Sequence, residues 1–209
     1  MNPAERHEQN RTEILQAAAR VIAQQGFHGM SMRKLARVTH RGLATFYNYF
    51  ASKEEVLFEL QHRAFSILIR SAEESLCEVK DPKEALHTFI ANHVEYLAAN
   101  PDTMQVLVHE AAALPPKWRK EVRGLKERYY HMGSDLVRSI MRPNGNAQEM
   151  EIERVTYNLF GMLNWVYGWY DPPRHGAIQD VAATIHRMAL HGMGGAGHKK
   201  QKSSHKPRS

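Results

Sequence analysis

The sequence predicts an all-α fold, and three observations support that prediction. Apolar residues recur at spacings of three and four, as on one face of a helix, and not at alternate positions as in a strand. Gly and Pro gather at a few places and leave long segments between them. Pro82, Pro101 and Pro116 each stand where a helix is expected to begin, because Pro suits the first helical turn.

The composition predicts that the chain forms a real core. Hydrophobic residues make up 43% and charged residues 24% of the 209 positions. These fractions lie near the averages of globular proteins, about 45% and about 25%, which argues against disorder of the whole chain. Most of the formal net charge of +6 lies in the last residues, 194–209, which contain five basic and no acidic side chains.

The first 60 residues predict three short helices followed by a longer one. Gly26 is a suitable C-cap for the first helix. The hydroxyl of Ser31 is a suitable N-cap for the second helix, and that of Ser52 for the fourth. Short helices in this order are typical of a helix-turn-helix domain, here residues 1–52, in front of a larger helical body. The expected ranges are 9–25, 32–38, 43–50 and a long amphipathic segment that begins at 53.

Longer helices are expected in the body, residues 53–193. The segment 149–170 is apolar on more than one side, so it must be buried from several directions. A subunit interface explains this pattern, and we expect a homodimer that forms through residues 149–170 and 177–192. The expected helices of the body beyond residue 80 are 82–97, 101–114, 116–141, 149–170 and 177–192.

The last segment, residues 194–209, has no large apolar side chain and only basic charges, so we expect a disordered tail. A solvated tail that is partly derived from cloning, and a weak polyanion-binding tail, are both open interpretations. The polar N-terminal stretch, the single Cys77 and the absence of a long apolar run predict a cytoplasmic protein that does not associate with membranes.

A basic patch marks the second and third expected helices. Arg33, Lys34, Arg37, Arg41 and Lys53 follow one another with no acidic residue between them. Such a patch on one small domain is a candidate surface for binding an anion. For Arg33 and Arg37, a solvated helix face and a contact with phosphate remain equal alternatives.

Three motifs carry a resemblance to a known family: Met32-Arg33-Lys34-Leu35-Ala36, Ala44-Thr45-Phe46-Tyr47-Asn48-Tyr49-Phe50 and Ser52-Lys53-Glu54-Glu55-Val56-Leu57. Together with Arg11 and Gly26-Phe27, they resemble the DNA-binding signature of the tetracycline-repressor (TetR) family over about residues 11–60. Two positions depart from the family pattern. His40 replaces the usual turn glycine and is expected in the left-handed conformation. Gly42 removes the usual hydroxyl cap of the next helix.

The resemblance implies a transcriptional regulator, and we expect a repressor. It also implies that residues 43–49 form a recognition helix in the major groove of a near-palindromic operator. Thr45 and Tyr47 match contact positions of the family, and Lys53 matches a phosphate contact. Phe46 and Phe50 are expected in the core instead. The full set of expected DNA-binding residues is Ser31, Arg33, Arg41, Leu43, Ala44, Thr45, Tyr47, Asn48, Tyr49 and Lys53.

The segment Phe160 to Pro172 resembles the C-terminal part of TetR regulators of fatty-acid, phenylacetate and sterol catabolism, many of which respond to acyl-CoA thioesters. The resemblance implies an apolar tunnel for an acyl chain and cations for the phosphates. Ordinary core packing is the alternative for the same apolar side chains, and a lipophilic drug or free fatty acid is the alternative effector. The expected tunnel residues are Phe89, Met104, Val108, Trp118, Tyr129, Met132, Met162 and Trp165, and the candidate cations are Lys117, Arg119, Lys120, Arg123, Lys126 and Arg128.

Catalytic and metal-binding motifs do not appear in the sequence. His87 and His93 are six residues apart and His186 and His191 are five apart, so neither pair shares a helix face as zinc ligands do. We therefore expect no metal, no cofactor and no enzyme activity. Two alternatives stay open: a helical protein or enzyme that binds lipid or CoA without specific DNA binding, and a nonspecific nucleic-acid-binding protein that depends on the basic tail.

Overall fold

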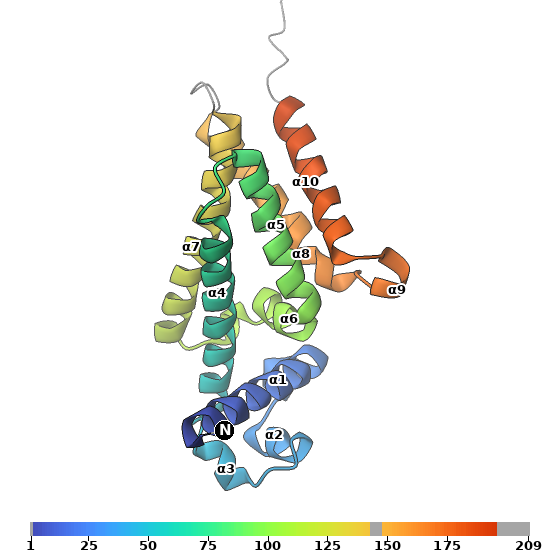
Figure 1. Ribbon diagram of the computed structural model, residues 1–209. Coiled ribbons are helices and arrows are strands. Elements are labelled where there is room, and N and C mark those ends of the chain that lie inside the picture. The colour runs from blue at the N-terminus through green and yellow to red at the C-terminus, as the bar shows by residue number, and fades with distance from the viewer. Residues whose placement is uncertain (1, 143–147, 196–209) are drawn as a thin grey trace, which may run out of the picture.

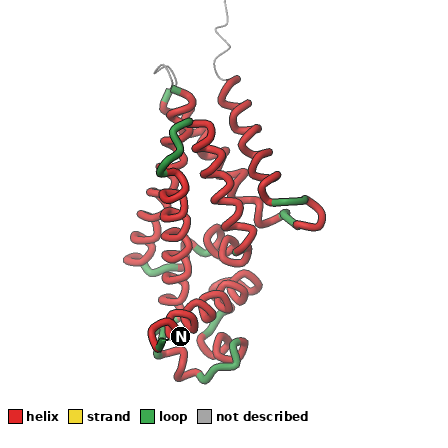
Figure 2. The backbone as a smooth tube through the Cα atoms, viewed as in Figure 1, coloured by secondary structure: helices red, strands yellow, loops and turns green. Residues whose placement is uncertain are grey.

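The computed structural model describes residues 2–142 and 148–195, and every regular element within these ranges is a helix (Figures 1 and 2). This confirms the all-α prediction. In the described part of the chain, no helix combines the length and apolar character needed to cross a membrane. The helices are α1 (Pro3–Gly29), α2 (Met32–Val38), α3 (Leu43–Tyr47), α4 (Lys53–Leu76), α5 (Pro82–Ala99), α6 (Pro101–His109), α7 (Pro116–Met141), α8 (Glu149–Trp165), α9 (Pro172–His175) and α10 (Ile178–Gly195), with short 3-10 helices η1 (Ala111–Ala113) and η2 (Val166–Gly168).

Side-chain caps define where several helices begin. The Ser31 hydroxyl accepts a hydrogen bond from the Lys34 N–H at 3.2 Å, and the Ser52 hydroxyl accepts one from the Glu55 N–H at 3.1 Å. Both caps are those that the sequence predicts. Each satisfies one of the backbone donors that the first turn of a helix leaves without an intrahelical partner.

Several helix ends differ from the prediction, among them that of α3, which ends at Tyr47 and not at residue 50. Helix α1 begins at Pro3, because Asn2 and Glu5 form a capping box on residues too polar to show a hydrophobic period. Helix α6 ends at His109 and not near residue 114. Helix α8 ends at Trp165 and passes into η2, where residues up to 170 were expected to stay helical. Most of the predicted tail, residues 196–209, lies outside the described residues.

The helices form two parts that α4 connects (Figure 1). Helices α1, α2 and α3 lie together at one end of the molecule. Helix α4 starts beside them and continues into the body, where it packs against α5 and α7. Helix α10 packs along α5, and α8 lies between α7 and α10. Helix α4 contacts helices of both parts. The boundary between a domain of residues 1–52 and a body of residues 53–193 therefore stays a prediction.

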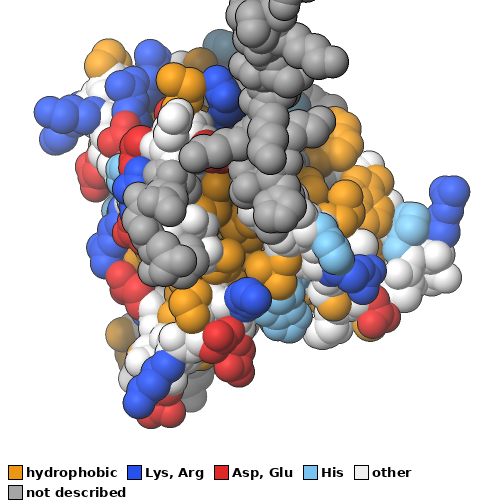
Figure 3. Space-filling view, turned by 90° about the horizontal axis from the view of Figure 1, so that it is seen from above, with side chains coloured by type: hydrophobic (Ala, Val, Ile, Leu, Met, Phe, Trp, Pro, Cys, Tyr) orange, Lys and Arg blue, Asp and Glu red, His pale blue; other side chains and the backbone are white. Residues whose placement is uncertain are grey.

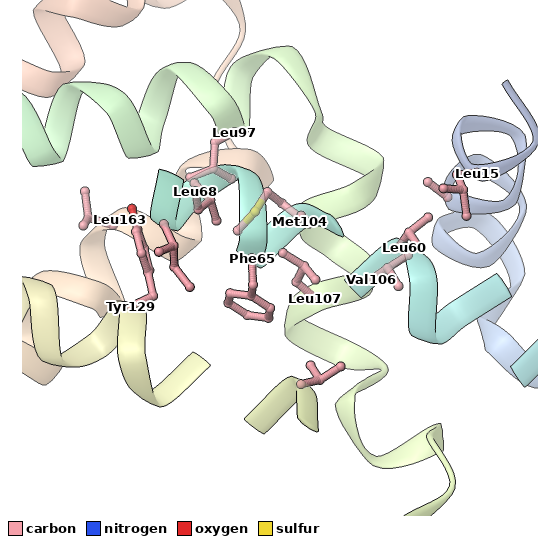
Figure 4. Packing of buried hydrophobic residues seen from close by; sticks show 14 of the residues in the cluster. Leu15, Leu60, Phe65, Leu68, Leu97, Met104, Val106, Leu107, Tyr129 and Leu163 are labelled. Atoms are coloured by element: carbon pink, nitrogen blue, oxygen red, sulfur yellow. The ribbon is translucent and has the colours of Figure 1, made fainter. Parts of the chain in front are cut away.

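Apolar packing joins the two parts. Phe46 and Phe50 are fully buried, which confirms the prediction that they belong to the core. At the junction, Leu15 of α1, Leu60 of α4 and Val106 of α6 point toward one another (Figure 4). Burial of such side chains contributes roughly 1.5–3 kcal/mol each. The contact of α1 with α6 is thus part of the same core that holds the body together.

A close approach inside the body explains Gly133 of α7. A Cβ atom at this position would lie 2.9 Å from the Phe160 ring of α8 and 3.3 Å from Phe89 of α5. Gly124, nine residues earlier on α7, would place its Cβ atom where no other atom lies within 4 Å. The two glycines share a helix but only Gly133 is required by packing.

We predict opposite effects of the same substitution at these two positions. Gly124→Ala raises the free energy of unfolding by up to about 1 kcal/mol, because Ala favours the helix. Gly133→Ala lowers it by about 1–3 kcal/mol, because the added methyl group overpacks the Phe160 contact. Thermal unfolding followed by circular dichroism measures both changes. An equal shift of Tm in the two variants contradicts this account of Gly133.

Candidate DNA-binding surface and effector cavity

The turn between α2 and α3 is built around His40. Its φ of 54° lies in the left-handed region, as expected for a residue that replaces the usual glycine. The Thr39 hydroxyl bonds the Leu35 carbonyl at 2.8 Å, and the Arg41 N–H bonds the Ala36 carbonyl at 3.0 Å. Gly42 caps α3 without a side-chain hydrogen bond, as the sequence suggests. The backbone therefore fixes the angle at which α3 leaves the turn.

Helix α3 presents a clear division between buried and exposed side chains. Phe46 points into the core, whereas Tyr47 has 55% of its surface exposed. Ala44 and Asn48 are also exposed, and Leu43 and Thr45 are half-buried. Ser31 and Arg33 at the start of α2 are exposed as well. Five of the ten expected DNA-binding residues are thus exposed, on α2 and α3 or at the ends of these helices.

Three of the expected DNA-binding side chains have partners on α1 or at its C-terminal end. Arg41 forms an ion pair with Glu13. The Lys53 ammonium group lies 4.5 Å from the centre of the Phe27 ring and 3.5 Å from the carbonyl oxygens of Phe27 and Met30. The Tyr49 hydroxyl accepts a hydrogen bond from Asn10 at 3.1 Å. These contacts hold α1, the turn before α3 and the start of α4 together.

A notch beside Tyr49 was not predicted from the sequence. It has a volume of about 260 Å³ and is lined by Pro3, Arg6, His7, Asn10 and Tyr49. The His7 ring stacks on the Tyr49 ring with centroids 4.5 Å apart. Arg6 and His7 precede the apolar residues of α1 in the sequence. Polar residues in this position indicate a solvated segment and not a binding surface.

The body contains a cavity of about 360 Å³ between α4, α5, α6, α7 and α8. Its lining is mainly apolar and aromatic, with His93, Asn164 and Lys126 as the polar exceptions. Such a composition, apolar with a few convergent polar groups, is typical of small-molecule sites. The lining residues are Phe65, Leu68, His93, Met104, Leu107, Val108, Lys126, Tyr129, Tyr130, Tyr157, Phe160, Gly161 and Asn164.

The structure divides the eight expected tunnel residues into three groups. Met104, Val108 and Tyr129 line the cavity. Phe89 lies behind it, stacked on Tyr129 at 5.0 Å, and Met132 is half-buried against the core.

The other three side chains lie elsewhere, and this corrects the expectation of a single tunnel. Trp118 stacks on Phe58 at 5.2 Å, away from the cavity. Met162 and Trp165 line a separate surface groove, because they lie on the side of α8 that faces away from the cavity.

Only one of the six candidate cations lines the cavity. Lys126 is exposed at its edge. Arg119 donates hydrogen bonds to the carbonyl oxygens of Leu114 and Ala112, and Arg128 forms an ion pair with Glu73 at 2.5 Å. The remaining cations of this stretch, Lys117, Lys120 and Arg123, do not line the cavity.

His93 is the buried polar group of the cavity. Burial lowers its pKa to about 4, and the neighbouring side chain of Asn164 offsets this shift only in part. The imidazole is therefore neutral at physiological pH. Its Nδ1 atom lies 3.1 Å from the Tyr129 hydroxyl, whose pKa is raised by burial, while Nε2 makes no hydrogen bond of normal geometry. A buried ring nitrogen in this state can bond a polar atom of a ligand.

The cavity connects to α1 through the end of α6. The Glu110 carboxylate accepts a hydrogen bond from the Phe27 N–H at 3.0 Å. The Glu110 carbonyl accepts one from Gln61 of α4 at 3.2 Å, and Gln105 bonds the Ala23 carbonyl of α1 at 2.9 Å. Glu110 therefore holds α1, α4 and the end of α6 at one point.

An apolar groove of about 750 Å³ lies between α8 and α10 on the outside of the body. Tyr157 and Trp165 on α8 and Met188 on α10 line it, with exposed fractions of 61%, 60% and 58%. Seen from above, hydrophobic side chains gather toward the middle and right of the visible face, and charged side chains lie mostly around its margin (Figure 3). Exposed apolar surface of this extent is typical of a protein interface.

Comparison with protein-family models identifies both parts of the chain. Residues 14–60 match the bacterial regulatory proteins of the tetR family. Residues 79–193, more than half of the chain, match the tetracyclin repressor-like C-terminal domain. The chain belongs to the TetR family. It is thus a transcriptional regulator with a helix-turn-helix DNA-binding domain, and the resemblance seen in residues 11–60 is confirmed.

Known proteins extend this family relation over most of the regulator. A fatty acid metabolism regulator protein of Bacillus subtilis is 23% identical over 152 residues, which cover 73% of this chain and 78% of the relative. A TetR-family regulator from Bordetella parapertussis superimposes with a TM-score of 0.81 at 26% identity, covering 86% and 93% of the two chains. AibR, in complex with isovaleryl coenzyme A and operator DNA, superimposes with a TM-score of 0.73 at 20% identity over 85% and 96%, which shows the shared fold.

The lowered pKa of His93 predicts a specific dependence of this regulator's stability on pH. The contribution of neutral His93 to the free energy of unfolding is fully present above about pH 6.5, the pKa of histidine in the unfolded chain. It is lost as pH falls through about 4, the pKa of His93 in the folded chain. The loss amounts to about 3 kcal/mol, because one pKa unit corresponds to about 1.4 kcal/mol. His93→Gln should flatten the free energy of unfolding between pH 6.5 and 4, measured by denaturant titration. His131→Gln, on an exposed position of α7, is the control and should keep the parent slope; an unchanged slope in His93→Gln refutes the assignment.

Proposed function

We propose that this regulator is a homodimeric repressor that leaves its operator when a lipophilic effector, such as an acyl-CoA thioester, enters the cavity. The observation that carries the proposal is the double role of α6. Met104, Leu107 and Val108 of α6 line the cavity, and Glu110, directly after the helix, bonds the backbone of Phe27 in α1. A ligand that displaces α6 therefore acts on α1, against which α2 packs, and α3 packs in turn against α2.

The DNA-binding surface in this proposal is the exposed side of α2 and α3. Tyr47 and Asn48 are the accessible side chains of α3 that reach base edges, and Ser31 and Arg33 contact phosphates. Arg6, which lines the notch beside Tyr49, adds a further phosphate contact. In a dimer, two copies of α3 enter major grooves about one helical turn, or ~34 Å, apart. The remaining proposed contacts are Arg41, Leu43, Ala44, Thr45, Tyr49 and Lys53.

The chemistry of the cavity favours an effector with an apolar chain and one polar group. The cavity volume of about 360 Å³ is near the lower end for small-molecule sites, roughly 300–1,000 Å³. It therefore suits an acyl chain and leaves a nucleotide outside. The Nε2–H group of neutral His93 can donate a hydrogen bond to a thioester carbonyl, and Lys126 at the edge can face phosphate. The names of two relatives, the fatty acid regulator and the complex with isovaleryl coenzyme A, agree with this effector class.

The proposed dimer forms through α8 and α10, within the predicted segments 149–170 and 177–192. The apolar groove of about 750 Å³ supplies the contact surface of each copy. The exposed side chains of Trp165, Trp169 and Met188 are large and can pack into the groove of the other copy. Trp and Tyr are enriched among the residues that dominate interface energetics. A two-fold axis would bring the same helices of both copies together.

The experiment that tests the function is selection of bound duplexes from random DNA at one fixed salt concentration. It is repeated with octanoyl-CoA, with long-chain acyl-CoA and with an aromatic acyl-CoA. We expect a near-palindromic consensus that is lost when one of these thioesters is added. A consensus that persists with every thioester contradicts the effector class, and the absence of any consensus contradicts specific DNA binding.

The operator found in this way allows a test of α3. Tyr47→Ala should weaken operator binding by about 1–3 kcal/mol, because an exposed contact with DNA is lost while the core is untouched. Lys83→Ala, at the exposed start of α5, removes a cation at the opposite end of the molecule and should leave affinity unchanged. Fluorescence anisotropy with labelled operator measures both. Equal affinities of Tyr47→Ala and Lys83→Ala rule out a DNA contact by Tyr47.

A further inference from the structure

The effector cavity and the apolar groove share one strip of α8. Tyr157 and Gly161 line both hollows. They are four residues apart, so they lie one above the other on the same helix face. No other residue lines both hollows. The strip formed by Tyr157 and Gly161 is therefore the place where the cavity meets the surface proposed for dimerisation.

The protomer gives no reason for a glycine at position 161. The residue is exposed in the interior of α8, and a Cβ atom there would meet nothing within 4 Å. A glycine inside a helix costs about 1 kcal/mol relative to alanine. At Gly133 the ring of Phe160 accounts for the glycine, but no such neighbour exists at Gly161. The space above Gly161 thus allows something from outside the protomer to approach the backbone closely.

Aromatic rings continue from the cavity to the groove along the same strip. Phe160 inside the cavity pairs with Tyr130 at 5.7 Å, and Tyr130 pairs with Tyr157 at 5.1 Å. The Tyr157 ring is 61% exposed. Tyr157 is the one ring of this series that lines both hollows, so the series leads from the cavity to the rim of the groove.

The composition of the groove points to a second copy of this chain as its occupant. Among its lining residues, Asp180 and His175 are the only ionisable groups besides Tyr157. Depletion of charge is characteristic of the buried centre of a protein interface. The same face carries a hollow and protruding side chains, Trp165 and Met188, so it is complementary to itself about a two-fold axis.

We propose that the second copy, seated on the groove, narrows the mouth of the effector cavity along Tyr157 and Gly161. The effector site is complete only in the dimer, and the inference rests on the proposed effector cavity and dimer. Ligand binding and dimerisation are then linked. Because a dimer has two effector sites, saturating effector raises the dimer affinity by the square of the factor by which dimerisation raises the affinity of each site.

The test uses octanoyl-CoA as the probe and Met188→Glu as the principal variant. Met188 lines the groove but not the cavity, so a charge there weakens the dimer without changing the effector site. Ala183→Glu, on an exposed position of α10 that does not line the groove, adds the same charge and is the control. Sedimentation velocity gives the dimer dissociation constant, and isothermal titration calorimetry gives the affinity for octanoyl-CoA.

Each site is expected to bind octanoyl-CoA about tenfold more tightly in the dimer, which lies within the usual range of coupling. With two sites, saturating octanoyl-CoA should therefore tighten the parent dimer by about a hundredfold. Met188→Glu should be monomeric and bind octanoyl-CoA about tenfold more weakly, and Ala183→Glu should match the parent. Gly161→Leu should weaken both dimerisation and octanoyl-CoA binding. The protomer should still fold, because a Cβ atom at this position meets no other atom within 4 Å.

The contrary results are separable. Equal octanoyl-CoA affinity in monomeric Met188→Glu and in the dimeric parent overturns the linkage and leaves the proposed effector class intact. No binding of octanoyl-CoA to the parent overturns both the effector class and the linkage.

Discussion

The hydrogen bond between the Glu110 carboxylate and the Phe27 N–H connects the effector half of the molecule to the DNA-binding half. The backbone of α1 leaves the helical conformation at Gly26, where φ is +71°, so the Phe27 N–H loses its intrahelical acceptor. Phe27 is buried, and a buried donor without a partner costs about 1–3 kcal/mol. Glu110 satisfies this donor. Gln61, itself buried, bonds the carbonyl of the same residue and brings α4 to the junction.

The position of Glu110 gives the cavity a short route to α1. Leu107 and Val108 line the cavity three and two residues before Glu110, and α6 ends at His109, directly before Glu110. In the proposed mechanism the effector favours a position of α6 that the bond to Phe27 does not fit. Ligand and operator then stabilise different conformations of one junction, and the ligand shifts the population by its difference in affinity for the two.

Local sequence signals predicted the elements well, because each depends on residues close together in the chain. Ser31 and Ser52 act as caps, and His40 adopts the left-handed turn, as expected. Contacts between distant residues gave no such signal. The partners of Arg41 and Tyr49 lie on α1, 28 and 39 residues away. The sequence does not distinguish the two apolar sides of α8. The prediction therefore places Met162 and Trp165 in the cavity, whereas the structure places them in the groove. The hydrogen bond of Glu110 joins residues that are 83 positions apart, and local sequence patterns do not reveal such a contact.

The most direct test of this account is the response of Glu110→Ala to octanoyl-CoA. Operator affinity is measured by fluorescence anisotropy with and without the thioester, and thioester binding is measured separately by calorimetry. Glu127→Ala, which removes an exposed carboxylate from α7, is the control. We predict that Glu110→Ala binds octanoyl-CoA as the parent does but that its operator affinity no longer changes with the thioester. A full loss of operator binding on adding octanoyl-CoA, equal to that of the parent, would contradict the central role of the Glu110 contact.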